Sequence, residues 1–208
     1  MPNSKSNFYI NFVIFGHTIY MNKQMKTRCD WVSNDDACVN YHDNEWGKPL
    51  HNDQKLFEFI LLEGFQAGLS WKTILKKREN FRKAFDEFDY QKIALYDDKK
   101  RAELKEDVGI IRNRLKIVSA TINAKAFIEV QKEFGSFDKY IWGFVSFKPI
   151  NNKGYNSYKD APTTTETSDI ISKDMKKRGF KFVGSTIIYA FMQAIGMVND
   201  HSDDCFCK

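Results

Sequence analysis

The sequence predicts an all-α fold. From Asp53 onward, apolar residues recur at the spacing of one face of a helix. Several of these segments follow a residue that commonly caps a helix, such as Ser70 and Ser136. The chain has no convincing run of alternating apolar and polar residues, the pattern that would indicate strands. Helices are therefore expected to build the whole core.

The first predicted helix is strongly apolar, begins at Asp53 and stops near Gly64. Ser70 is expected to cap a basic helix that runs to about Phe85. Further helices are predicted at about 90–95, 99–106, 113–133 and 136–144, with a sharp turn at 108–112.

The last third of the chain begins with a predicted exposed loop at 147–162, which contains two prolines and Gly154. Thr167 or Ser168 is then expected to cap a helix that ends at Gly179. A final helix at about 186–197 is apolar on nearly all sides, so it should be buried.

Composition and length are those of a globular protein. The 208 residues allow one sizeable core or two small lobes, and 42% hydrophobic with 28% charged residues is an ordinary balance. The net charge of +5 is compatible with a polyanionic partner but does not require one.

The first 25 residues differ from the rest. The apolar segment 8–21 is short for a membrane span and is interrupted by Asn11, Gly16 and His17, so neither a membrane anchor nor a signal peptide is expected. Met21 and Met25 each offer a later start. We therefore predict an N-terminal extension at 1–25, either poorly ordered or not part of the native chain, and one folded domain at 26–208.

Two pairs of potential zinc ligands lie near opposite ends of the chain. Cys29 and His42 come early, and His201 and Cys205 come late. Cys and His are preferred zinc ligands, and a closed set of four has no open position for catalysis. The four cysteines of the chain could instead form two disulfides, but the spaced histidines favour a reduced, cytoplasmic metal site. One structural Zn²⁺ would then tie the two ends of the domain together.

Glu63 is the most unusual charged residue. It follows a run of largely apolar residues at the end of a predicted buried helix, where the helix dipole and desolvation both disfavour a carboxylate. Either it is exposed or satisfied by backbone donors, or it is retained to bind a cationic or donor-rich ligand.

Six segments together closely resemble the DNA-3-methyladenine glycosylase I family, and the resemblance runs from about Arg28 to Cys207. They are CDWVS at 29–33, YHDNEWG at 41–47, LEGFQAGLSW at 62–71, GIIRN at 109–113, RGFKFVG at 178–184 and VNDH at 198–201. The resemblance implies a helix-hairpin-helix DNA glycosylase fold, with two helical lobes and a pocket between them. It also implies excision of 3-methyladenine from alkylated double-stranded DNA by base flipping.

The resemblance assigns roles to several residues. It makes Cys29, His42, His201 and Cys205 the ligands of a structural zinc. It makes Glu63 the residue that recognises the flipped base, which carries a formal positive charge when methylated at N3. The aromatic residues that would line the pocket are Trp31, Tyr41 and Trp71, with Trp46 in the core beside the zinc. Cys38 departs from the family pattern, in which some members have tyrosine.

Four further residues are candidates for contact with DNA. Leu69 is expected either to fill the gap left by the flipped nucleotide or to be a buried turn leucine. Gly109 begins the segment that resembles the DNA-binding hairpin, and Arg112 and Lys116 add positive charge near it.

The predicted enzyme is a cytoplasmic monomer. No aspartate or lysine stands convincingly where superfamily members use them for catalysis, so a monofunctional glycosylase without lyase activity is expected. A non-enzymatic zinc-stabilised DNA-binding module and a glycosylase for another lesion are the alternatives.

Overall fold

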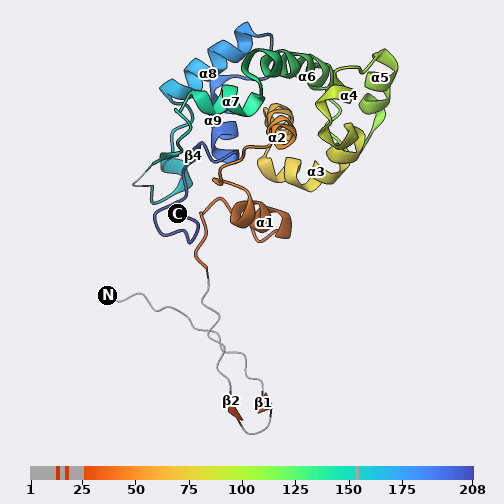
Figure 1. Cartoon of the computed structure of the whole chain (residues 1–208). Helices are drawn as coiled ribbons and strands as arrows, with labels where there is room; N and C mark the ends of the chain where they lie inside the picture. Colours follow the sequence, from red (N-terminus) through yellow and green to blue (C-terminus); the bar gives the residue numbers. More distant parts are fainter. Residues whose placement is uncertain (1–12, 15–16, 19–25, 153–154) are drawn as a thin grey trace.

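A computed structural model describes residues 13–14, 17–18, 26–152 and 155–208 (Figure 1). Helices dominate this part of the chain, as predicted. The strands in the described residues are each two residues long. They pair as β1 (Val13–Ile14) with β2 (His17–Thr18) and β3 (Ile150–Asn151) with β4 (Val198–Asn199). Apart from β1 and β2, the predicted extension at 1–25 lies outside the described residues.

The first helix, α1 (Asp36–Asn44), has no counterpart in the sequence prediction. Asp35 caps it by accepting a hydrogen bond from the N–H of Ala37. Most of its residues are polar, so it lacks the apolar stripe by which a helix is found in a sequence. Its buried side chains are Cys38, Tyr41 and His42.

The second helix, α2 (Asp53–Gln66), begins where predicted but extends two residues beyond Gly64. A Cβ at Gly64 would lie 3.4 Å from the Cβ of Phe182. Gly64 therefore allows close packing within the helix and does not end it.

The predicted helices that follow are present, with small shifts at their ends. Ser70 caps α3, Asn113 caps α6, and Ser136 caps α7, each accepting a hydrogen bond from the backbone of the first turn. The bounds are α3 Trp71–Ala84, the 3-10 helix η1 Asp86–Phe88, α4 Tyr90–Ile93, α5 Asp98–Glu106, α6 Arg114–Phe134 and α7 Phe137–Gly143.

Two C-terminal helices correct the predicted boundaries. The N-cap of α8 (Glu166–Lys177) is Thr165, and neither Thr167 nor Ser168 has that role. Ser168 stands at the third helical position and completes a capping box with Thr165. The buried α9 (Ser185–Ala194) is shorter than predicted, and the chain turns at Gly196 with a φ of +71°.

Most described residues of the segment at 147–162 are exposed, as predicted, but two short regular elements occur within it. It contributes β3, which pairs in parallel with β4, and the 3-10 helix η2 (Tyr158–Asp160). Ser157 Oγ and the Tyr158 N–H both donate to the carboxylate of Asp30, at 2.6 and 3.0 Å. These bonds attach η2 to the N-terminal segment beside Cys29.

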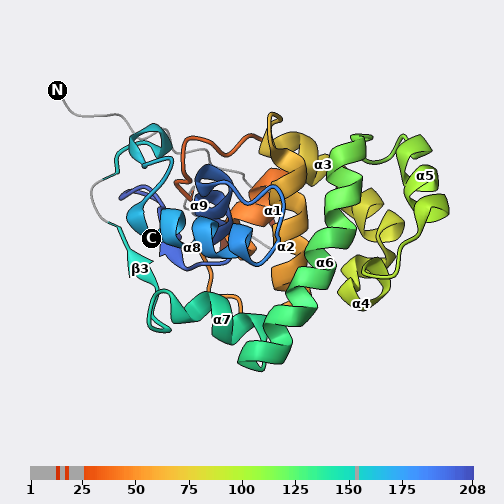
Figure 2. The same cartoon turned by 90° about the horizontal axis from the view of Figure 1, so that it is seen from above.

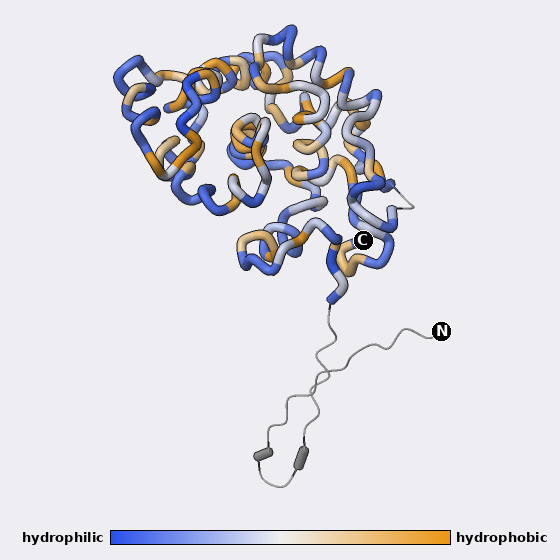
Figure 3. Tube along the Cα trace, turned by 180° about the vertical axis from the view of Figure 1, so that it is seen from behind, coloured by the Kyte–Doolittle hydropathy of each residue, from blue (hydrophilic) through white to orange (hydrophobic). Residues whose placement is uncertain are grey.

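The centre of the molecule is α2, which packs against α3, α6, α7 and α9 (Figures 1 and 2). The tube view shows the hydrophobic residues of the molecule inside a more hydrophilic exterior (Figure 3). The aromatic core around it consists of Phe57, Phe65, Phe81, Phe85, Phe127 and Phe137, all at most 1% exposed. Glu63 therefore lies near the end of the most enclosed helix.

Candidate active site and metal centre

The four predicted zinc ligands meet at one point, which we call the metal clasp. The side chains of Cys29, His42, His201 and Cys205 are buried, and their donor atoms all lie within 4.8 Å of one another. In Figure 1 the C-terminal end of the chain lies beside the segment that precedes α1. The clasp thus joins residues separated by 172 positions in the sequence.

The spacing of these atoms fits a tetrahedral zinc. Cys29 Sγ and Cys205 Sγ lie 3.5 Å from His201 Nδ1, and Cys205 Sγ lies 3.4 Å from His42 Nε2. Tetrahedral bonds of about 2.3 Å to sulfur and 2.05 Å to nitrogen would separate S and N by about 3.6 Å. The residues present therefore suit a closed Cys₂His₂ site.

The surroundings of the clasp favour neutral histidines, as metal ligands must be, but disfavour thiolates in the absence of a cation. Burial lowers the pKa of His42 and lowers that of His201 to about 4, so both rings are neutral at pH 7. Burial raises the pKa of the Cys29 thiol to about 11, so a thiolate there requires a nearby cation.

Outer contacts hold the two rings in place. His42 Nδ1 lies 2.8 Å from Asp43 Oδ1, and the Asp43 carboxylate accepts two hydrogen bonds from Arg28 at 2.7 and 2.8 Å. His201 Nε2 faces the carbonyl oxygen of Trp46 at 3.3 Å. Ligand histidines usually have such partners on the second nitrogen, where they orient the ring.

A cavity of about 290 Å³ opens next to the clasp, and we call it the aromatic pocket. Trp31, Tyr41 and Trp71, the predicted pocket residues, all line it, as do Glu63 and Cys38. Its remaining lining residues are Ser33, Trp46, Gln66, Ser70, Lys72, Tyr158, Ala190 and Gln193. The predicted set is therefore brought together in one place.

The aromatic rings surround the cavity in tilted and edge-to-face contacts. The centroids of Trp31 and Trp46 are 5.0 Å apart, and those of Tyr41 and Trp71 are 5.2 Å apart. Trp46 has the predicted core position beside the clasp, because its ring lies 4.6 Å from that of His201. The clasp and the pocket thus share one aromatic cluster.

Glu63 is 3% exposed, so its predicted alternative as an exposed helix-end residue is excluded. Its Oε2 atom is buried without a hydrogen-bond partner in the described structure. Desolvation raises the pKa of the carboxyl to about 8. An isolated buried acid of this kind is costly and is typical of binding and catalytic sites.

Other pocket groups also lack partners. Within the described residues, the indole N–H groups of Trp31 and Trp71 and the hydroxyl of Ser33 are buried without hydrogen bonds. Buried polar groups are nearly always paired, so several unpaired groups in one cavity make it a candidate binding site. A flat molecule with both hydrogen-bond donors and acceptors would suit its aromatic lining.

Glu58, one and a half turns earlier on α2, shows the opposite arrangement. It is 1% exposed and paired with Lys55, Arg78 and Arg82 at 2.9, 2.7 and 3.1 Å. Burial acts to raise its pKa, but these cations bring the pKa below its usual value. Arg78 also binds Glu45 through both terminal nitrogens, joining α1 to α2 and α3.

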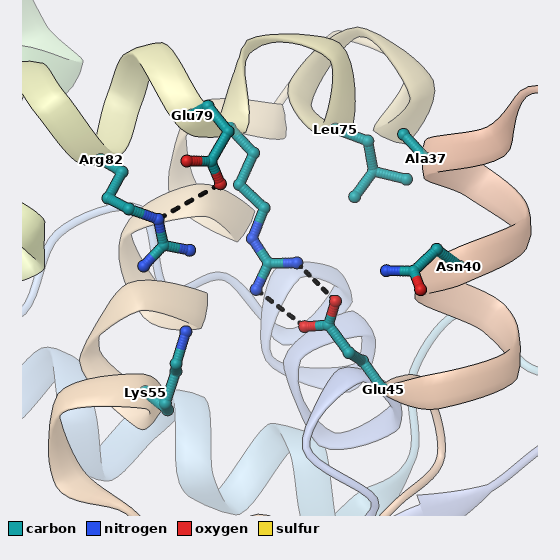
Figure 4. A pocket seen from close by; sticks show the side chains of 8 residues that line it. Ala37, Asn40, Glu45, Lys55, Leu75, Glu79 and Arg82 are labelled. Carbon is teal, nitrogen blue, oxygen red and sulfur yellow. Dashed lines mark hydrogen bonds and ion pairs between the residues drawn. The ribbon is translucent and has the colours of Figure 1, made fainter.

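These ion pairs border a second cavity of about 320 Å³ (Figure 4). In Figure 4 the dashed lines join Arg82 to Glu79 and the carboxylate of Glu45 to the guanidinium of Arg78. Because the charges around it are already paired, this cavity is a structural junction, and the aromatic pocket is the candidate active site.

Among the pocket residues that were not predicted, two come from the C-terminal third of the chain. Tyr158 lies in the segment expected to be an exposed loop, yet its ring contacts Trp31 and Trp46 at centroid distances of 6.2 and 6.1 Å. Gln193 lies on α9, whose apolar sequence indicates a helix of the core and gives no sign of a binding site. The one available signal was Gln193 itself, a long polar side chain in a helix predicted to be buried.

The predicted hairpin is present between α5 and α6. Lys77 Nζ donates to the carbonyls of Val108 and Gly109 and attaches the turn to α3. A Cβ at Gly109 would lie 2.9 Å from Asp107 Oδ1, so only glycine fits without displacement. The N–H groups of Ile111 and Arg112 make no hydrogen bond within the described residues, which leaves them available to an anion.

The remaining predicted DNA contacts are placed differently from one another. Arg112 is exposed, and Leu69 is 41% exposed, which excludes its alternative as a buried turn leucine. Lys116 is 6% exposed, and its ammonium donates to the carbonyls of Phe65 and Ala67 at 2.9 and 2.6 Å. The predicted phosphate contact of Lys116 is corrected accordingly. Its charge satisfies the carbonyl end of α2.

This difference can be measured by the salt dependence of DNA binding. Lys116→Met should lower the free energy of unfolding by about 1–3 kcal/mol and leave the slope of log K against log salt unchanged. Arg112→Ala should leave the melting temperature nearly unchanged and reduce the slope by about one. Equal reductions of the slope in both variants would restore Lys116 as a phosphate contact.

In the part of the chain that the structure describes, no helix is long and apolar enough to span a membrane.

Comparisons with known proteins agree over nearly the whole domain. Residues 31–208 match a family model described as methyladenine glycosylase. DNA-3-methyladenine glycosylase of Haemophilus influenzae is 49% identical over 184 residues, covering 88% of this chain and 99% of the relative. DNA-3-methyladenine glycosylase 1 of Escherichia coli is 49% identical over 180 residues, covering 86% and 96%.

Solved structures show the same architecture. A crystal structure of 3-methyladenine DNA glycosylase I is 50% identical with a TM-score of 0.84, covering 87% of this chain and 99% of that one. A variant of 3-methyladenine DNA glycosylase I in complex with 3-methyladenine is 34% identical with a TM-score of 0.84, covering 87% and 97%. The agreement in sequence, fold and length shows that this chain belongs to the methyladenine glycosylase family.

Proposed function

We propose that this protein is a DNA repair glycosylase that hydrolyses the N-glycosidic bond of 3-methyladenine in alkylated double-stranded DNA. The observation that carries the proposal is Glu63, a carboxylate enclosed by aromatic rings with one oxygen unpaired. The names of the relatives support the same substrate. A structure of one relative holds 3-methyladenine itself.

The charge of the lesion matches the charge of the pocket. Methylation at N3 makes adenine in DNA formally cationic, whereas unmodified adenine is neutral. A cationic base would favour the ionised form of Glu63 and lower its pKa from about 8. Neutral adenine would leave the desolvation cost of the carboxylate uncompensated, so the pocket selects the alkylated base.

The chain's own residues account for binding and orientation. The aromatic rings of Trp31, Tyr41 and Trp71 would stack on or enclose a base extruded from the duplex. Glu63 would hold the base edge through charge and hydrogen bonds, while water reaches the sugar carbon. The base leaves as a neutral molecule, so little general-acid assistance is needed.

We further propose one structural Zn²⁺ in the metal clasp. A zinc with four protein ligands offers no position for water or substrate, so it stabilises the fold and takes no part in hydrolysis. Reduced thiols at this site are consistent with a protein that works on chromosomal DNA in the cytoplasm. The protein is proposed to act as a monomer.

The reaction is proposed to be monofunctional. Within the described structure no lysine lines the aromatic pocket except Lys72, which is exposed at its rim, and no buried amine faces Glu63. Borohydride added to the enzyme with abasic-site DNA should therefore trap no covalent adduct, as judged by gel mobility. A trapped adduct would show a Schiff base and contradict a reaction by water alone.

A panel of duplex oligonucleotides with single lesions tests the function itself. Free 3-methyladenine should be released from methylated DNA, and an oligonucleotide with an oxidised purine should remain intact. Binding to DNA without release of any base would favour the alternative of a non-enzymatic zinc-stabilised module. Release of a different base would identify a glycosylase of other specificity.

A further inference from the structure

The wall of the aromatic pocket formed by α9 and η2 contains a glutamine whose orientation is fixed from behind. Gln193 is 2% exposed and lines the cavity. Its Nε2 atom donates to Asp200 Oδ2 at 2.7 Å.

Asp200 accepts hydrogen bonds from three neutral side chains. It is 1% exposed, and besides Gln193 it binds the hydroxyl of Tyr189 and the amide nitrogen of Asn152, both at 2.6 Å. The atom of the Gln193 amide that faces this carboxyl group is Nε2, a hydrogen-bond donor, so the amide presents its NH₂ group to Asp200. The carbonyl oxygen of Gln193 is consequently held on the opposite side of the amide.

That carbonyl oxygen retains capacity to accept hydrogen bonds. Its one recorded partner is the Tyr158 hydroxyl at 3.4 Å, which is long for a bond between two oxygens. A carbonyl has two acceptor positions, and one left unmatched in a buried site is unfavourable. The pocket therefore contains two fixed acceptors, Gln193 Oε1 and the carboxylate of Glu63.

We propose that Gln193 is a specificity-determining residue whose carbonyl oxygen accepts a hydrogen bond from the exocyclic amino group of the bound base, with Asp200 as its positioning residue. This inference rests on the proposed function. Adenine-type bases carry an amino group as donor, whereas hypoxanthine- and guanine-type bases carry a carbonyl oxygen at the corresponding ring carbon. A fixed acceptor would favour the first class and repel the second, independently of the positive charge that Glu63 recognises.

The test compares two free bases by calorimetry, 3-methyladenine and 3-methylpurine, which lacks the amino group. Wild-type protein should bind 3-methyladenine at least about ten-fold more tightly, the effect of one buried hydrogen bond. In Gln193→Leu this preference should fall by about ten-fold through weaker binding of 3-methyladenine, while the affinity for 3-methylpurine stays nearly constant. An unchanged preference in the variant would overturn the proposal, as would equal affinities for the two bases in wild-type protein.

A second variant guards against a folding defect in Gln193→Leu, which leaves Asp200 with one donor fewer. Tyr158→Phe removes a hydroxyl that competes for Gln193 Oε1 from a side chain that is 38% exposed. The preference for 3-methyladenine over 3-methylpurine should be retained or rise, because Gln193 Oε1 is still present and has lost a competing donor. A ten-fold loss of that preference would assign recognition of the amino group to the Tyr158 hydroxyl and overturn the role of Gln193.

The outcome is distinguishable from failure of the proposed function. If wild-type protein neither binds 3-methyladenine nor releases it from methylated DNA, the proposed function is wrong. If wild-type protein binds and releases 3-methyladenine, but its preference over 3-methylpurine is independent of Gln193, the proposed function stands and the role of Gln193 is wrong. Zinc content and melting temperature of each variant show whether the fold is retained.

Discussion

Replacing Glu63 by Gln is expected to lower excision of 3-methyladenine by roughly 30- to 150-fold and at the same time to stabilise the folded protein. A hydrogen bond to a charged group contributes about 2–3 kcal/mol, which gives that range of rates. The unpaired Oε2 atom makes the carboxylate unfavourable in the empty pocket, and a neutral amide removes the burial of a charge. Single-turnover excision and thermal unfolding measure the two effects.

The stabilisation should depend on pH in a defined direction. The pKa of Glu63 is about 8 in the folded protein and near 4.5 when unfolded, so between these values the folded state binds more protons. The contribution of Glu63 to stability is therefore complete below about pH 4.5 and is lost as pH rises toward 8. The advantage of Glu63→Gln should grow from pH 5 to pH 9, and an advantage that shrinks would contradict the buried, unpaired state.

Glu58→Gln is the matched control on the same helix. Glu58 is equally buried but paired with three cations, so its replacement should destabilise the protein by about 3–5 kcal/mol. Similar effects of the two substitutions on stability would mean that the difference in pairing has no energetic consequence.

Loss of the proposed zinc from the metal clasp is expected to have the largest effect on stability. Cys29→Ser or His201→Ala should reduce bound zinc well below one ion per chain and lower the melting temperature strongly. Structural zinc binding contributes on the order of 10 kcal/mol at neutral pH in small domains, and the clasp joins the two ends of this domain. Metal analysis and calorimetry with and without a chelator are the measurements.

Cys207→Ser provides the control, because Cys207 lies close to His42 and Asp43 but outside the set of four ligands. This variant should keep one zinc and an almost unchanged melting temperature. Full zinc occupancy in both Cys29→Ser and His201→Ala would refute the clasp.

The elements that sequence predicts well are those decided by local interactions. Ser70 and Ser136 cap helices at the predicted positions, because a capping side chain bonds to backbone only two or three residues away. The polar helix α1 is missed for the corresponding reason. This helix packs through residues of the pocket and the clasp, among them Tyr41 and His42, and has no apolar stripe that periodicity would detect.

The parts of the pocket and the clasp that could be predicted are those in which a residue type is rare for its position in the sequence. Glu63 in an apolar helix and the Cys and His pairs at the two ends were visible in the sequence, and the structure brings each set together. Tyr158 and Asp200 were not recognised, since each is an ordinary residue type in its own segment, and Gln193 was missed although it is polar in a helix predicted to be buried. Their relation exists only after η2, α9 and the C-terminal segment have packed against one another.

The sequence by itself determined most of the helices, the caps Ser70 and Ser136, the Cys and His residues that meet in the clasp, and the family. Only the tertiary structure decided which charges have partners. Glu58 is neutralised by three cations and Glu63 by none, although both lie on the same buried helix. Lys116, predicted to face DNA, instead closes the end of that helix. The physical reason is that caps and helical periodicity depend on near neighbours in the chain, whereas desolvation and pairing depend on what distant segments place around each charge.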